Sequence, residues 1–286
     1  MGDILYSYFQ PSFVDFYDMM VETCFGGIHS TDVQEFCTLF KHRLESSSAK
    51  APEFRTVDLG TGTGRCILAL LNSLQEGKIS QKDLHFLGLD NSEVMIKRAL
   101  EKLQSLSNDE SKKNVTVGIK VQSLEDWDVP EWHEGVDLIL AAAGPFHHLL
   151  TESAVVRTLK QIELHLKAKG EGLAVINLLS PDQLFHREIR DSEGLALTEE
   201  AFKVGPYRRW RVNHEMSVVD GARVMHEKFK LTRVSADESV EWEEQEEWTL
   251  REVDRDRLVS LAAQVGLEQL LDVRTPCKDC LFFQRK

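Results

Sequence analysis

The most distinctive chemistry in this sequence lies in the stretch VDLGTGTG, residues 57–64, where an apolar run ends in Asp58 and three alternating glycines follow. A nucleotide P-loop requires Gly-Lys-Ser/Thr, whereas Gly64 is followed by Arg65 and Cys66. A dinucleotide-binding turn requires its third glycine three residues after the second, and here the separation is two. The spacing therefore disfavours both phosphate-binding loops.

Asp58 indicates what the loop holds instead. A carboxylate directed into a ligand cleft repels a pyrophosphate but attracts an ammonium or sulfonium cation. A glycine turn also lets a ligand approach the backbone, and a helix that starts after the turn offers free N–H groups. The sequence thus favours a ligand that carries a positive charge.

The elements around this loop alternate between short apolar runs and helical patterns from residue 54 to residue 179. Strands that alternate with helices of ten to fifteen residues predict βαβ units and a parallel sheet covered on both faces. We therefore expect an α/β fold with a doubly wound, mostly parallel sheet of seven strands, preceded by N-terminal helices.

After residue 179 the pattern changes. A hairpin is predicted from Tyr207 to Val234, with its turn at Asp220 and Gly221, followed by a third antiparallel strand in SVEWEEQEEW. Thr249 and Glu252 form a capping-box pattern that predicts the start of the last helix, and two closing strands are expected to pair as an antiparallel edge. The predicted division is an N-terminal helical cap (1–50), a ligand-binding core (51–179), an antiparallel lid that contacts the substrate (180–248), and the last helix with the closing strands (249–286).

The glycine loop resembles motif I of the class I S-adenosylmethionine-dependent methyltransferases, in which this turn holds the methionine part of the cofactor. The resemblance covers about residues 54–179 and implies a Rossmann-like fold with S-adenosyl-L-methionine as cofactor. In FLGLDNSEVMIKRA, Asp90 ends the second predicted strand, where the family acid accepts the two ribose hydroxyls. Further family positions match KVQSLEDWDVP, VDLILAAAGP and the helix FVDFYDMM. The cofactor residues that the resemblance implies are Tyr17, Asp58, Gly60, Thr61, Gly62, Gly64, Asp90, Asn91, Met95, Ser123, Leu124, Ala141 and Ala142.

Methyl transfer is an in-line displacement, so the protein mainly aligns the acceptor and excludes water. A hydroxyl or cationic amine acceptor also has to lose a proton, which favours a nearby base. We expect this base at His147, in the PFHHL stretch that also contains His148, or at His214 on the predicted hairpin. Packing roles for all three histidines remain the alternative.

The acceptor is expected to be a small molecule, methylated at O, N or S. Methyltransferases that act on adenine or glutamine carry an Asn-Pro-Pro-Tyr type tetrapeptide after the fourth strand, where this chain has Ala-Ala-Gly-Pro. Three alternatives remain open. A nicotinamide-dependent oxidoreductase lacks support from the glycine spacing, whereas a cofactor-binding protein with another reaction and a regulatory subunit are compatible with the motifs.

Composition limits the remaining classes. The chain has 286 residues and a formal net charge of −13, which argues against nucleic acid or an anionic membrane surface as partner. Five scattered cysteines fit a reducing compartment, so a cytoplasmic location is expected. The pair Cys277 and Cys280 lacks a second ligand pair, so no metal is predicted. No run of about eighteen apolar residues is present to cross a membrane.

Overall fold

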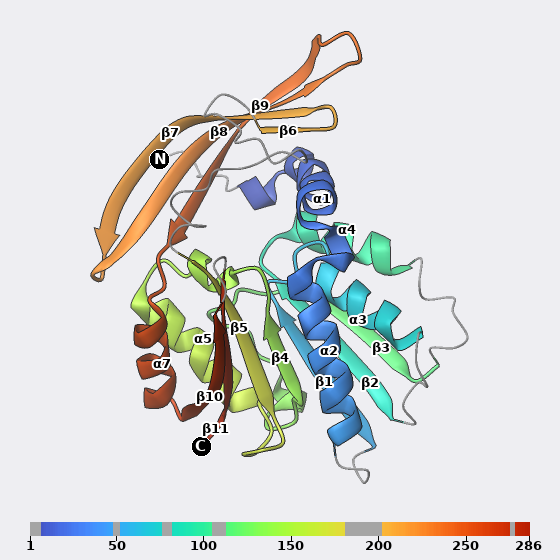
Figure 1. Ribbon diagram of the computed structural model, residues 1–286, viewed down its shortest axis with the longest axis vertical. Helices are drawn as coiled ribbons and strands as arrows, with labels where there is room; N and C mark the ends of the chain where they lie inside the picture. The colour runs from blue at the N-terminus through green and yellow to red at the C-terminus, as the bar shows by residue number, and fades with distance from the viewer. Residues whose placement is uncertain (1–6, 48–51, 76–81, 105–112, 181–201, 275–277) are drawn as a thin grey trace.

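The computed structural model describes residues 7–47, 52–75, 82–104, 113–180, 202–274 and 278–286. A central sheet with helices on both sides forms one part of the molecule, and a long antiparallel sheet lies above it (Figure 1). Within the described ranges no helix is long and apolar enough to cross a membrane.

The central sheet has seven strands in the order β10-β11-β5-β4-β1-β2-β3. The five strands on the β3 side pair in parallel, and β11 is antiparallel to both of its neighbours. The predicted mostly parallel sheet is confirmed, and so is the antiparallel pairing of the two closing strands at its edge, where β11 lies between β5 and β10. The strand bounds are β1 Glu53–Leu59, β2 Asp83–Asp90, β3 Val115–Val121, β4 Leu138–Ala141, β5 Leu173–Leu179, β10 Leu267–Arg274 and β11 Lys278–Arg285.

Helices cover both faces of this sheet. One buried cluster joins α5 and α7 to one face, and a second joins α2 and α3 to the other. The central strands β4 and β5 are buried on both sides for this reason, which explains their nearly continuous apolar sequences. The α-helices are α1 Pro11–Phe25, α2 Thr31–Ser46, α3 Arg65–Gln75, α4 Glu93–Gln104, α5 Glu152–His165 and α7 Arg255–Gln264, and the short 3₁₀ helices are η1 Ser7–Phe9, η2 Gly27–His29, η4 Pro130–Trp132 and η5 Pro145–His148.

The second sheet is an antiparallel meander in the order β6-β7-β8-β9. Its bounds are β6 Phe202–Val204, β7 Tyr207–Val219, β8 Ala222–Val234 and β9 Val240–Arg251. The predicted hairpin is confirmed, with Asp220 and Gly221 in the left-handed turn conformation.

The predicted start of the last helix was wrong. Thr249 pairs with His226 of β8, so β9 continues through the capping-box pattern. Glu246, Trp248 and Leu250 are buried alternately, and this period of two holds the segment in the strand. The helix α7 begins at Arg255, and its N-cap is Asp254, whose side chain accepts a hydrogen bond from the backbone N–H of Arg257.

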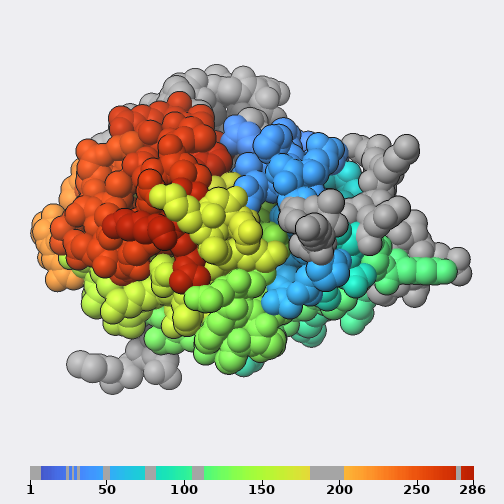
Figure 2. Space-filling view, turned by 90° about the horizontal axis from the view of Figure 1, so that it is seen from below, coloured from blue at the N-terminus to red at the C-terminus, as the bar shows by residue number. Residues whose placement is uncertain are grey.

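A third buried cluster places the meander over the carboxyl ends of the parallel strands. It joins Phe13 and Phe16 of α1 to Phe229 and Trp248 of the meander and to Met95 of α4. Seen from below, the red C-terminal residues border the yellow and green middle of the chain, with blue N-terminal residues beyond (Figure 2). The N-terminal helices and the meander are therefore packed together, although distant in sequence.

Candidate active site

The glycine loop connects β1 to α3 with a backbone that requires glycine. Gly60, Gly62 and Gly64 have φ angles of 70°, 53° and 83°. A Cβ atom on Gly60 would lie 2.7 Å from Cβ of Pro145, and one on Gly64 would lie 3.2 Å from Cβ of Ala99. The loop thus combines a left-handed backbone with close neighbours, as a turn that holds a ligand against its backbone requires.

Asp90 fixes the loop from the neighbouring strand. Its Oδ2 accepts the backbone N–H of Gly62 at 2.9 Å, and its Oδ1 accepts that of Ser92 at 2.9 Å. Burial raises the pKa of Asp90 despite these hydrogen bonds. The carboxylate therefore orders the glycine turn as well as facing the cavity, a role that sequence alone did not predict.

Asp58 lies beneath the loop and is almost completely buried. The hydroxyl of Thr61 donates to its Oδ2 at 2.7 Å, whereas its buried Oδ1 has no hydrogen-bond partner in the described part of the chain. Burial raises the pKa of Asp58 to about 7. An acceptor atom left unpaired in this way fits a cofactor that brings an ammonium group to the loop.

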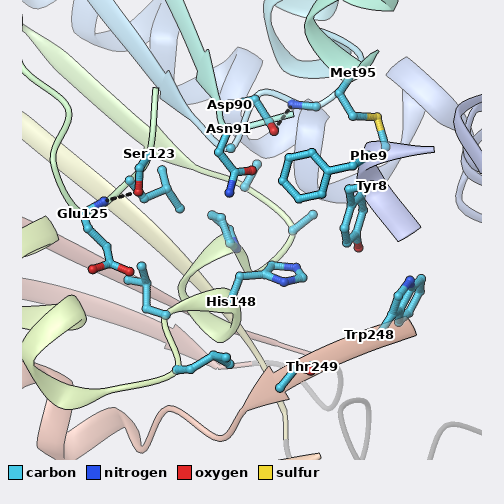
Figure 3. A pocket seen from close by; sticks show the side chains of 18 of the residues that line it. Tyr8, Phe9, Asp90, Asn91, Met95, Ser123, Glu125, His148, Trp248 and Thr249 are labelled. Carbon is cyan, nitrogen blue, oxygen red and sulfur yellow. Dashed lines mark hydrogen bonds between the residues drawn. The ribbon is translucent and has the colours of Figure 1, made fainter. Parts of the chain in front are cut away.

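A cavity of about 350 Å³ opens above the loop, within the size range of small-ligand sites. Asp90 and Asn91 lie at one end, Trp248 and Thr249 of β9 lie at the other, and His148 lies between them (Figure 3). The residues that line it are Tyr8, Phe9, Tyr17, Gly60, Gly62, Asp90, Asn91, Met95, Ser123, Leu124, Glu125, Ala142, Ala143, Pro145, His148, Leu149, Leu150, Thr151, Glu247, Trp248 and Thr249.

The fold brings most of the expected cofactor residues to this cavity. Those that line it are Tyr17, Gly60, Gly62, Asp90, Asn91, Met95, Ser123, Leu124 and Ala142. Three further expected residues support the loop without lining the cavity: Asp58, Thr61 and Gly64. The last, Ala141, belongs to the buried core on one face of the sheet.

His147 does not reach the cavity, contrary to its expected catalytic role. Its Nδ1–H donates to the carbonyl of Arg251 at 2.8 Å, and its Nε2 accepts the backbone N–H of Leu179 at 2.9 Å. Both ring nitrogens are therefore used to join β9 to the end of β5. Consecutive residues of the 3₁₀ helix η5 point in different directions, and His148 is the one that lines the cavity.

His214 is also outside the cavity. Its Nδ1 lies 3.1 Å from the carboxylate of Glu227 on the neighbouring strand, an ion pair within the meander. The meander does contact the cavity, but through Glu247, Trp248 and Thr249 of β9 and not through the predicted hairpin. The reason is that β9 is the strand that leads back to the core, whereas β7 lies farther out in the sheet.

The aromatic end of the cavity, formed by Tyr8, His148 and Trp248, was missed by sequence reasoning. Tyr8 stacks on Trp248 with ring centroids 5.9 Å apart and meets His148 edge to face at 5.2 Å. These three rings come from segments separated by about 140 and 100 residues, so no local pattern joins them. An aromatic-rich N-terminal segment was the only available signal.

The cavity is lined by acidic and aromatic side chains. Among the described lining residues, Asp90, Glu125 and Glu247 are acidic, and none is lysine or arginine. Glu125 pairs with Arg157, and Glu247 pairs with Lys228 at 2.9 Å. The cavity therefore favours cationic over anionic ligands.

One group of potential metal ligands exists elsewhere. Asp128, His133 and His165 bring their ligand atoms within 4.8 Å of one another. However, His165 Nε2 accepts the N–H of Val129 at 3.0 Å, and Nδ1–H donates to the carbonyl of Gln161. The ring keeps no lone pair for a metal, and this cluster gives no reason to revise the expectation of a metal-free site. Cys277 of the CKDC stretch lies outside the described residues.

The loop geometry yields a first prediction. Gly60→Ala should lower affinity for S-adenosylmethionine at least about tenfold, which equals about 1.4 kcal/mol, because the new Cβ displaces the turn from Pro145. The matched control is Gly170→Ala, which has a similar φ of 84° but no atom within 4 Å. Both variants should lose about 1 kcal/mol of stability from backbone strain alone. Calorimetry should show weaker binding only for Gly60→Ala, and equal affinities would contradict the steric role.

The buried His147 yields a second prediction. Burial lowers its pKa to about 4, so below the ordinary value of 6.5 the unfolded chain binds a proton that the folded chain does not. This histidine therefore contributes stability that is present above pH 6.5 and is lost as the pH falls toward 4. Urea unfolding should show that the free energy of unfolding of the wild type, relative to that of His147→Gln, rises by about 3 kcal/mol as the pH increases from 4 to 6.5. A difference independent of pH would contradict the neutral buried ring.

The comparisons with known proteins agree with this site. Residues 57–171 match a family model described as "Methyltransferase domain". A search of curated proteins found no match. Among solved structures, an S-adenosylmethionine-dependent methyltransferase from Clostridium acetobutylicum has a TM-score of 0.64 at 14% identity, over 96% of this chain and 98% of its own.

Two further structures share the fold. The sugar N-methyltransferase KedS8 from Streptoalloteichus has a TM-score of 0.60 at 12% identity, over 95% of this chain and 92% of its own. The amino pentose methyltransferase CalS10 from Micromonospora echinaspora has a TM-score of 0.56 at 15% identity, over the full length of both chains. Residues 57–171 of the chain therefore match a methyltransferase domain, and the chain as a whole has the fold of S-adenosylmethionine-dependent methyltransferases.

Proposed function

We propose that the enzyme transfers the methyl group of S-adenosylmethionine to an amine nitrogen of a small molecule. The observation that carries this proposal is the charge of the cavity, which has three carboxylates and four aromatic rings in its described lining and no lysine or arginine. Such a lining suits an ammonium group or an amine better than a phosphate or carboxylate.

The glycine-loop end is proposed to hold the cofactor. The unpaired Oδ1 of Asp58 suits the cofactor's ammonium group, and Asp90 is placed at the cavity for the ribose hydroxyls. The loop glycines leave space for close approach to the backbone. When bound, S-adenosylmethionine supplies an activated methyl group on a sulfonium.

The aromatic end is proposed to hold the acceptor. Tyr8 and Trp248 present ring faces and edges on which an amine-bearing molecule can pack. His148 lies beside them, and the described chain offers no hydrogen-bond partner to its ring. Loss of solvation, followed by its neighbour His147, lowers the pKa of His148, although part of the ring is exposed at the cavity surface. Because an ordinary histidine is already mostly neutral at pH 7, the proposal needs no large shift. A neutral imidazole can accept the N–H of an acceptor amine and align its lone pair.

The names of two structural neighbours support an amine acceptor. KedS8 is a sugar N-methyltransferase, and a further neighbour, MtfA, is a glycopeptide N-methyltransferase with a TM-score of 0.50. The odd number of cysteines, five, scattered along the sequence, supports the expected cytoplasmic location. The four-part division of the chain, with residues 180–248 as the lid, remains part of the proposal.

The test is incubation with isotope-labelled S-adenosylmethionine and matched panels of amines, alcohols and carboxylic acids. Mass spectrometry should detect labelled methyl on amines, and the Asp90→Ala variant should form little product. Labelled alcohols or acids without labelled amines would overturn the choice of acceptor. Cofactor binding without any product from a whole metabolite extract would overturn methyl transfer itself.

A further inference from the structure

A second cavity lies where the tip of the β7–β8 hairpin approaches the central sheet. Its volume is about 440 Å³, and it is enclosed by the hairpin turn, the end of β9 and the first turns of α5 and α7. The hairpin is held there by Asp220, whose Oδ2 accepts the N–H of Glu152 at 3.1 Å. This cavity shares no lining residue with the active-site cavity.

Arg251 lines this cavity and is buried, with 5% of its surface exposed. Its Nε is buried without a hydrogen-bond partner. Throughout the described ranges, no hydrogen bond or ion pair engages the guanidinium group. A buried N–H group without a hydrogen-bond partner is unfavourable, so the position of this arginine requires an explanation.

The carboxylates around the cavity form their hydrogen bonds with other groups, although the charge of Arg251 helps to lower the pKa of Glu152. Glu152 forms two hydrogen bonds with Arg257, at 2.8 and 2.5 Å, and this arginine lowers the pKa of Glu152. Glu252 forms two with Arg223, at 2.7 and 2.8 Å, which likewise lower the pKa of Glu252. Each of these acids is thus already paired with another arginine.

The two aspartates at the cavity are compensated by helices. Asp254 caps α7 by accepting the N–H of Arg257 at 2.7 Å, and Asp220 occupies the N-terminus of α5. Helix N-termini stabilise negative charge at these positions. Arg251 is therefore the charged residue of this cavity whose side chain has no hydrogen-bond partner in the described part of the chain.

We propose that this cavity is a second binding site, in which Arg251 holds an oxyanion, either a carboxylate or a phosphate group. The planar guanidinium presents parallel N–H donors that match two oxygens of either group. Val155, Leu258 and Leu261 line the same cavity and offer an apolar surface to the body of a small organic anion. The site is independent of the proposed amine acceptor, because the two cavities are separate.

The test measures thermal unfolding of the full chain, without cofactor or acceptor, while sodium phosphate or sodium acetate replaces sodium chloride at constant ionic strength. The wild type should show a saturable rise in Tm, as expected for a ligand that binds only the folded state. Calorimetry should show that Arg251→Met weakens the apparent affinity at least about tenfold. The matched control is Arg233→Met, at an exposed arginine of β8 that pairs with Glu241.

Arg251→Met also gives a second measurement, the change in Tm without anion, whose sign would be the opposite if the arginine had a purely structural role. Because Met fills the volume without the charge, Arg251→Met should raise Tm when no anion is added. A lower Tm would show that the guanidinium has its own partners and would overturn the proposal. The proposal would also be overturned if phosphate and acetate gave the wild type the same Tm as chloride, or if Arg251→Met kept the wild-type rise in Tm. If Arg251→Met fails to fold, Arg251→Gln replaces it in both measurements. A response to phosphate but not acetate identifies phosphate as the ligand group, and the reverse identifies carboxylate.

Discussion

Asp90→Ala is expected to lower the affinity for S-adenosylmethionine about 100-fold or more. The substitution removes a carboxylate proposed to accept two ribose hydroxyls, and two charge-assisted hydrogen bonds at about 1.5 kcal/mol each total about 3 kcal/mol. It also removes the acceptor for the N–H groups of Gly62 and Ser92, so the glycine turn loses its support from β2. Calorimetry with the cofactor and with its demethylated product measures the change.

The controls separate ligand contact from loss of fold. Asp90→Asn keeps the size and one carbonyl oxygen, so it should bind with intermediate affinity. Asp126→Ala removes an exposed acid close to the same sheet edge and should bind as the wild type does. Circular dichroism should show folded Asp90→Ala, and an affinity within twofold of the wild type would exclude Asp90 as a cofactor residue.

His148→Phe is expected to lower the rate of methyl transfer on the order of 100-fold, the usual effect of removing a group that takes part in proton transfer. Phe keeps the aromatic contact with Tyr8 but cannot accept a hydrogen bond from the acceptor amine. Affinity for the demethylated cofactor should remain unchanged, because the ring lies toward the β9 end of the cavity. Single-turnover rates measured with excess enzyme isolate the transfer step.

His147→Gln is the matched control at the adjacent position. It removes the hydrogen bonds to Arg251 and Leu179, so it should lower stability while leaving the rate per folded molecule close to normal. His148→Gln should recover part of the rate, since an amide oxygen can still accept a hydrogen bond. Equal losses from both histidines, or none from His148→Phe, would show that the enzyme works without an imidazole in the cavity.

The sequence by itself determined the cofactor end of the site. The residues there follow consecutive strands of one parallel sheet, so their order along the chain fixes where they meet. Asp58, the glycines and Asp90 are each placed by a local turn at the end of a strand, and short-range patterns report such turns well. The same applies to the hairpin, whose turn at Asp220 and Gly221 is a local signal.

The tertiary structure alone decided the acceptor end and the second cavity. Tyr8 and Trp248 meet across 240 residues, and no local pattern specifies that contact. His147 and His148 are neighbours of the same type, and only the packing of η5 against β5 and β9 determines which one faces the cavity. The capping-box pattern predicted a helix start at Thr249 and so gave no indication that Arg251 ends a strand and is buried. The segment is a strand because alternating packing along β9 outweighs the modest stabilisation of a helix cap.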